Sequence, residues 1–242
     1  MKPSWTRRSS RLTLWLGISA ILVALLGLML ARYDLIPKIA GLYAMIGGAL
    51  IAFSGVLVGL TAGVLNVKHK AQNWVAALIG LVLSGGYAGF VVSRADAARA
   101  VPAIHDVTTD LANPPTFHRL TLRPDNLVGV GTFQNWRAIH AKAYGDLKPV
   151  TLARPVAGIL ADTQRLAQQY GWAIVAVDPI AGQMEATASV SFIRYKDDIV
   201  LRAVPTPDGR GSIVDMRSVS RIGVSDFGVN AKRIRAFLAA LQ

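Results

Sequence analysis

The stretch LTLWLGISAILVALLGLMLA, residues 12–31, contains no charged side chain and is flanked by Arg11 and Arg32. A helix of about 20 apolar residues crosses the ~30 Å hydrocarbon core of a bilayer. The alternative is a cleaved signal peptide, because a cluster of basic residues precedes the stretch. We expect a retained span, since the apolar run is too long for a signal core and no small-x-small cleavage site precedes Arg32.

Two further apolar stretches follow the first. The chain carries no charge between Lys38 and Lys68, which predicts a second span over residues 40–65. A third span is expected over residues 74–92, with Trp74 in the position of an interfacial aromatic residue. Short polar links join the three, so residues 1–93 are predicted to form an up-down-up transmembrane bundle.

Small residues recur every four positions in the second span, at Gly55, Gly59 and Gly63. Such ridges allow helix backbones to approach closely in a membrane. They predict packing of the three helices on one another. The alternative is an interface with a second copy of the chain or with another membrane protein.

The expected spans contain no Asp, Glu, Lys, Arg or His. Ion paths and proton relays normally place an ionisable group inside the membrane, so this pattern favours an anchor over a transporter. The formal net charge is +12, and the first 100 residues hold ten of the 26 basic residues but only two of the 14 acids. Basic residues beside apolar spans indicate the anionic lipid bilayer as partner, and we expect no nucleic-acid binding.

The basic residues next to the spans also predict an orientation. The side with more Lys and Arg in short flanking segments is usually the cytoplasmic one. One side carries Lys2, Arg7, Arg8, Arg11, Lys68 and Lys70, and the other carries Arg32, Lys38, Arg94 and Arg99. We therefore expect a multi-pass protein of a bacterial inner membrane, with a cytoplasmic N-terminus and a periplasmic C-terminal domain.

The rest of the chain predicts a soluble α+β domain. Pro-rich residues 94–151 indicate an extended, loop-rich arm. Residues 152–242 predict a helix after Pro155, four strands and a final helix that begins near Asn230. We expect an antiparallel four-stranded sheet with both helices packed on one face. The chain has no cysteine, which excludes disulfides and thiolate nucleophiles, and we expect neither a cofactor nor a metal.

A dense polar cluster precedes the final helix. Two guanidinium groups, several hydroxyls and a helix N-terminus could bind a phosphate or a carboxylate. The candidate ligand-binding residues are Arg217, Ser218, Ser220, Arg221, Ser225 and Asn230. The alternative is a structural loop whose arginines pair with acids of the domain itself.

Candidates for catalysis are sparser. An imidazole and carboxylates could act as general acid and base, and the residues concerned are His105, Asp110, Asp198 and Asp226. The structural alternatives are Asx turns in the arm and a hydrogen-bonded strand start. A catalytic site would require one of these acids to meet His105 in a concave pocket.

Several motifs together resemble a known family. HDVTTD at residues 105–110, YGDLKP, KDD and the long DMRSVSRIGVSDFGVNAKRIRAFL look like the family catalogued as domain of unknown function 1499. The resemblance covers about residues 105–241 and implies a membrane-anchored or lipoprotein-like bacterial protein. It implies no catalytic residue, because the family has no established reaction. We therefore expect a binding or scaffold module, and the alternative is an envelope hydrolase.

Overall fold

A computed structural model of the chain describes residues 3–70 and 73–242. The chain divides into two compact units, Met1–Ala100 and Val101–Gln242. Lys2, which contributes to the predicted orientation, lies outside the described residues.

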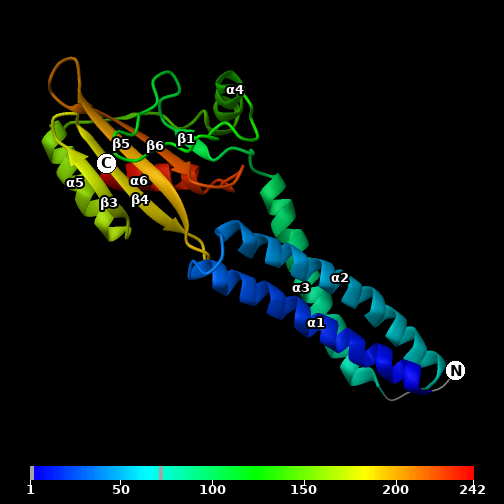
Figure 1. Ribbon diagram of the computed structural model, residues 1–242. Coiled ribbons are helices and arrows are strands. Elements are labelled where there is room, and N and C mark those ends of the chain that lie inside the picture. Colours follow the sequence, from blue (N-terminus) through cyan, green and yellow to red (C-terminus); the bar gives the residue numbers. More distant parts are fainter. Residues whose placement is uncertain (1–2, 71–72) are drawn as a thin grey trace. The chain divides into compact units, whose positions relative to one another are not determined.

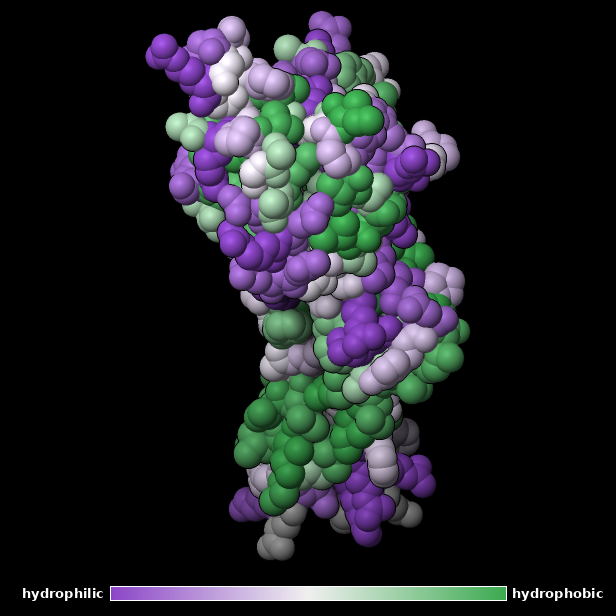
Figure 2. All heavy atoms as spheres, turned by 90° about the vertical axis from the view of Figure 1, so that its left-hand side faces the viewer, coloured by the Kyte–Doolittle hydropathy of each residue, from purple (hydrophilic) through white to green (hydrophobic). Residues whose placement is uncertain are grey.

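The first unit is a bundle of three helices, α1 (Pro3–Arg32), α2 (Lys38–Lys68) and α3 (Trp74–Arg99) (Figure 1). All three are long and apolar enough to cross a membrane, which confirms the expected number of candidate spans. Figure 2 shows that hydrophobic side chains cover the visible side of these helices. A surface of this kind is typical of contact with lipid tails. The third helix continues to Arg99, past the predicted end of the span.

Glycines allow the three helices of the bundle to pack closely. A Cβ atom added to Gly80 would lie 2.4 Å from the backbone carbon of Thr13, and one added to Gly55 would lie 2.3 Å from the Ser84 hydroxyl. Gly59 likewise packs against Thr13, so the small residues permit close helix contact. An added Cβ on Gly63 would meet nothing within 4 Å. An intermolecular interface through the three glycines stays a prediction.

The second unit contains a six-stranded antiparallel sheet. Its order is β1-β6-β5-β4-β3, and β2 also pairs with β6. The strands are β1 (Asp106–Thr108), β2 (Val150–Leu152), β3 (Ala173–Asp178), β4 (Gln183–Val190), β5 (Tyr195–Pro205) and β6 (Ser212–Ser220). The prediction of four strands was therefore wrong. The two strands it missed span three residues each, too short to show an alternating pattern.

The predicted arm also contains a helix, α4 (Phe133–Tyr144). The Thr132 hydroxyl caps it by accepting a hydrogen bond from the Asn135 amide at 3.1 Å. Its buried side chains are Trp136, His140 and Tyr144, spaced four residues apart. This face is aromatic and partly polar, so it lacks the aliphatic stripe by which an amphipathic helix is normally recognised.

Helices α5 (Val156–Gln169) and α6 (Val229–Leu241) supply the rest of the core. Ile159 and Leu160 of α5 and Ile234 and Phe237 of α6 are buried in one cluster with the inward-facing residues of the sheet. Those sheet residues are Met184, Ala186, Ile199, Leu201, Val214 and Met216. Because side chains alternate along a strand, the other face carries the polar residues of β4, β5 and β6.

Candidate functional site

Arg217 is buried and paired with an acid. Its Nε and Nη2 atoms donate to the two carboxylate oxygens of Asp106 at 2.9 and 2.6 Å, and Nη1 donates to the Pro115 carbonyl at 3.2 Å. The Asn126 amide also donates to Asp106, at 2.6 Å. A bidentate pair of this kind satisfies both partners. Arg217, which was predicted to bind an anionic ligand, is therefore paired with Asp106 of the domain itself.

Arg221 is paired as well but remains accessible. Its Nε and Nη2 donate to the carboxylate of Asp198 at 2.8 to 3.1 Å, and Nη2 also reaches the Thr187 hydroxyl at 3.2 Å. The Arg221 side chain is 47% exposed, whereas that of Asp198 is buried. The Asp198 carboxylate raises the pKa of the Arg221 guanidinium. This arginine can still present a positive charge to a surface partner.

The segment after β1 covers the polar face of the sheet. Glu185 of β4 is buried, and its carboxylate accepts hydrogen bonds from the backbone amides of His118, Arg119 and Leu120 at 2.5 to 3.1 Å. Three backbone donors compensate a buried carboxylate well. Glu185 thus fixes residues 118–120 over the sheet, a role that its place in an alternating strand does not indicate.

A second pair lies farther along the same face. Arg202 donates to Asp215 at 2.8 Å and to the Asn113 carbonyl at 3.0 Å. Burial raises the pKa of Asp215, and Arg202 partly opposes this rise. Asp110 lies 3.7 Å from Arg202, and its carboxylate also accepts hydrogen bonds from the Ala112 and Asn113 amides. Asp110 therefore closes an Asx turn, the structural alternative named for it.

The N-terminus of α6 is filled by the protein's own groups. The carboxylate of Asp226 accepts hydrogen bonds from the Gly228 amide at 2.9 Å and the Asn230 amide at 2.6 Å. Burial raises the pKa of Asp226, and these two amides lower it. A helix N-terminus favours an anion, and here the anion is Asp226.

Asn230 connects this helix to the sheet. Its side-chain oxygen accepts from the Ser218 hydroxyl at 2.8 Å and from Arg233, and its amide donates to the His105 carbonyl at 2.9 Å and the Ser220 hydroxyl at 3.1 Å. Three predicted ligand-binding residues, Ser218, Ser220 and Asn230, thus form one buried hydrogen-bonded cluster. Ser225 lies apart in the β6–α6 loop, where its hydroxyl donates to the Pro102 carbonyl at 3.3 Å.

The imidazole of His105 has a hydrogen-bond partner other than the candidate acids. Its imidazole is buried, and its Nε2 lies 3.3 Å from the Asn126 side-chain oxygen. Burial lowers the pKa of His105, and the nearby Arg123 lowers it further. Asp198 and Asp226 are engaged with Arg221 and with the α6 amides, respectively. Within residues 3–70 and 73–242, no group of three His, Asp or Glu residues is placed to hold a metal.

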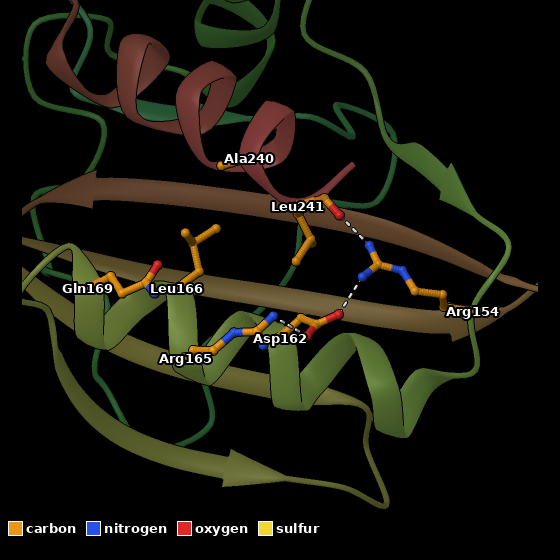
Figure 3. Close-up of a pocket in the computed structure, with 7 residues that line it drawn as sticks. All are labelled: Arg154, Asp162, Arg165, Leu166, Gln169, Ala240 and Leu241. Atoms are coloured by element: carbon orange, nitrogen blue, oxygen red, sulfur yellow. Dashed lines mark hydrogen bonds and ion pairs between the residues drawn. The ribbon is translucent and has the colours of Figure 1, made fainter.

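A hollow that the sequence did not indicate lies between α5 and α6 (Figure 3). It has a volume of about 320 Å³, and its lining includes Arg154, Asp162, Arg165 and Leu241. Asp162 pairs with both arginines, and Arg154 also donates to the Leu241 carbonyl. Residues 154 and 241 are distant in sequence, so only the tertiary structure brings them together. Asp162, at the centre of the hollow, offsets part of the positive charge of the two arginines.

The described surface also bears apolar side chains in two loops at one end of the sheet. They are Phe192 in the β4–β5 turn and Ile222, Val224 and Phe227 in the β6–α6 loop. None of the four was among the candidate site residues that the sequence indicated. A run of isolated apolar residues among polar ones, SRIGVSDFG, was the available signal.

Comparison with protein families matches residues 106–241 to the family described as "Protein of unknown function (DUF1499)". Comparisons with curated proteins and with solved structures gave no match. The matched segment contains the sheet and helices α4, α5 and α6, and it agrees with the range that the motifs indicated. Because the match covers more than half of the chain, the protein belongs to this family.

Proposed function

We propose that this protein is a membrane-anchored envelope protein whose C-terminal domain is a binding or scaffold module. One observation carries the proposal. The acids and arginines singled out as site residues are paired with charged groups of the domain or accept hydrogen bonds from its backbone amides. Among the described residues, no hydrogen bond joins one of these acids to the His105 imidazole, as general acid–base catalysis between them would require.

The three helices supply the anchor. Their charge-free interiors favour attachment over transport, as ionisable groups at membrane depth mark transport paths. The basic N-terminal flank supports a cytoplasmic N-terminus and a periplasmic domain in the inner membrane of a bacterium.

Arg221 is the candidate ligand-binding arginine that favours an anionic partner. Arg221 keeps about half of its side chain exposed, although it is paired with Asp198. Arg217 is buried and held by Asp106. We therefore assign the contact with an anionic partner to Arg221 and to the loop that follows it, and not to Arg217.

The hydrolase alternative has less support. It requires His105 to share a proton with Asp110, Asp198 or Asp226, and the hydrogen bonds of the described residues pair His105 with Asn126 instead. The test is turnover of chromogenic ester, phosphate and peptide substrates by the purified full chain. Activity lost in His105→Gln but kept in the exposed control Lys142→Gln would overturn the binding-module proposal.

Reporter fusions test the anchoring and its direction. Alkaline phosphatase fused after Gln242 should be active, because it would fold in the periplasm. The same reporter fused after Lys70, between the second and third spans, should be inactive. The reverse pattern would overturn the orientation, and soluble fusion protein in a cell fractionation would overturn the anchor.

A further inference from the structure

Strand register brings three connections to one end of the sheet. Asp106 at the start of β1 pairs with Val219, and Ser220 at the end of β6 pairs with Asp197 near the start of β5. The β4–β5 turn, residues 191–194, follows β4 at this same end. The segment that leaves α3, the β4–β5 turn and the β6–α6 loop therefore lie at the same end of the sheet.

This end carries partly exposed apolar side chains. Phe227 is 56% exposed, Phe192 49%, Val224 42% and Ile222 37%. Single exposed apolar residues are ordinary, but four in two adjoining loops make a patch of the kind that marks a binding surface. Phe227 has a left-handed backbone, with a φ of 54°, and lies between the capping residue Asp226 and Gly228.

Basic side chains outnumber acidic ones beside the patch: Asp125 is exposed near it, but it is paired with Arg123, which also donates to the Gly223 carbonyl. Arg194, Lys196 and Arg221 are exposed there. Two further acids at the same end, Asp197 and Asp198, are buried and paired with arginines. A surface that combines aromatic and aliphatic side chains with basic ones is the type that binds the interface of an anionic bilayer.

The patch is also tethered to the chain that leaves α3. The Asp226 amide donates to the Ile104 carbonyl at 3.3 Å, and the Ser225 hydroxyl donates to the Pro102 carbonyl at 3.3 Å.

We propose that this end of the sheet docks on the anionic headgroups of the membrane in which the chain is anchored. Phe192, Ile222, Val224 and Phe227 would enter the interface, and Arg194, Lys196 and Arg221 would contact lipid phosphates. The inference rests on the proposed anchoring and names the lipid surface as the anionic partner. It gives the domain a defined orientation on the membrane.

The absence of cysteine allows a clean test with one introduced probe. The variant Phe227→Cys of the full chain is labelled with an environment-sensitive nitrobenzoxadiazole dye and reconstituted into vesicles containing phosphatidylglycerol and phosphatidylcholine. The emission should shift to the blue and be quenched several-fold more by nitroxide-labelled lipid than that of the control Ile180→Cys. Ile180 is 100% exposed and lies in the β3–β4 turn, at the opposite end of the sheet.

Two further variants separate the contributions. A probe at Ile222→Cys, which leaves Phe227 in place, should behave like the probe at Phe227→Cys. Adding Arg194→Gln and Lys196→Gln to the labelled Phe227→Cys chain should weaken docking by about fivefold per basic side chain. Raising the salt concentration from 0.1 to 1 M should reduce docking too, since the Debye length falls from about 10 to about 3 Å.

The outcomes distinguish docking from anchoring. Water-like emission at residues 222 and 227 in protein that resists carbonate extraction would overturn docking and leave the anchor intact. Protein extracted by carbonate would overturn the anchor itself. A spectral shift produced by inorganic phosphate in pure phosphatidylcholine vesicles would overturn docking in favour of a soluble anion.

Discussion

The guanidinium of Arg217 and the carboxylate of Asp106 form a buried, bidentate salt bridge between neighbouring strands, although 111 residues separate them in the sequence. A buried charge without its partner is strongly destabilising. We expect Arg217→Met to lower the free energy of unfolding by about 3–5 kcal/mol, because Asp106 stays buried and loses its main partner. Chemical denaturation of the full chain in detergent, followed by tryptophan fluorescence, measures the change.

The control for this prediction is the exposed pair between Arg235 and Asp146, 2.7 Å apart. Arg235→Met should cost less than about 1 kcal/mol. The double variant Asp106→Asn with Arg217→Met should lose less stability than the two single changes added together, since the residues interact directly. A loss from Arg217→Met no larger than the control's would contradict the buried pair.

We expect the C-terminal domain to become less stable on acidification because of His140. Its Nε2 accepts a hydrogen bond from the Thr108 amide at 3.1 Å, and burial lowers the pKa of His140 below 6.5. As the pH falls through about 6.5, the unfolded chain takes up a proton that the folded chain does not bind. The stabilisation is therefore present above that pH and is lost below it, by at most about 1.4 kcal/mol per pH unit.

Unfolding free energies at pH 7.5, 6.5 and 5.5 test this dependence. In His140→Gln, an amide oxygen can accept the Thr108 hydrogen bond but cannot take up a proton in this range, so the slope should be smaller. Some slope should remain, because burial also lowers the pKa of His105. The contributions of the carboxylates are common to both proteins and cancel in the comparison. Equal slopes would show that His140 does not titrate differently on folding.

Glu185 should hold the segment over the polar sheet face. Removing its charge in Glu185→Gln replaces an acceptor of three backbone amides by a group that cannot accept all of them. Hydrogen bonds to a charged group contribute about 1.5–3 kcal/mol each. We expect the amides of His118, Arg119 and Leu120 to exchange with deuterium at least about tenfold faster, as followed by mass spectrometry. Ser189→Ala, at an exposed position of the same strand, should leave their exchange unchanged.

Close helix contact in the bundle should depend on Gly80. Its missing Cβ lets the backbone of Thr13 approach, so Gly80→Ala should destabilise the helices by about 1–3 kcal/mol. Gly63→Ala is the matched control, as an added Cβ there meets nothing within 4 Å. Unfolding in sodium dodecyl sulfate, monitored by circular dichroism, compares the two. If Gly63→Ala lost as much stability as Gly80→Ala, Gly63 would also be closely packed, against a partner other than the described residues.

Sequence pattern predicted some elements well and others poorly, for identifiable reasons. The strand Gln183–Val190 alternates between apolar and polar side chains, and this period of two was visible along its length. Helix α4 was missed because its buried residues, Trp136, His140 and Tyr144, form a mixed face. Strands β1 and β2 gain their structure from pairing with β6, and three residues alone carry no periodic signal.

The candidate site was likewise predicted only in part from the sequence. The motif around residues 217–230 was recognised as a concentration of arginines and hydroxyls, and its alternative as a self-paired loop was left open. Arg217 meets Asp106 and Arg221 meets Asp198 only because β1, β5 and β6 pair in one register. A shift of one residue would place these side chains on the other face of the sheet.

The amino-acid sequence by itself determined the three candidate spans, the basic flanks and the family, because hydrophobic length, charge and motif are local properties of the chain. Only the tertiary structure decided that Arg217 is buried against Asp106, that Asp226 fills the N-terminus of α6, and that Phe192 and Phe227 lie at the same end of the sheet. Those relationships depend on which strands become neighbours and in which register. Both are set by the packing of the whole domain and not by any one segment.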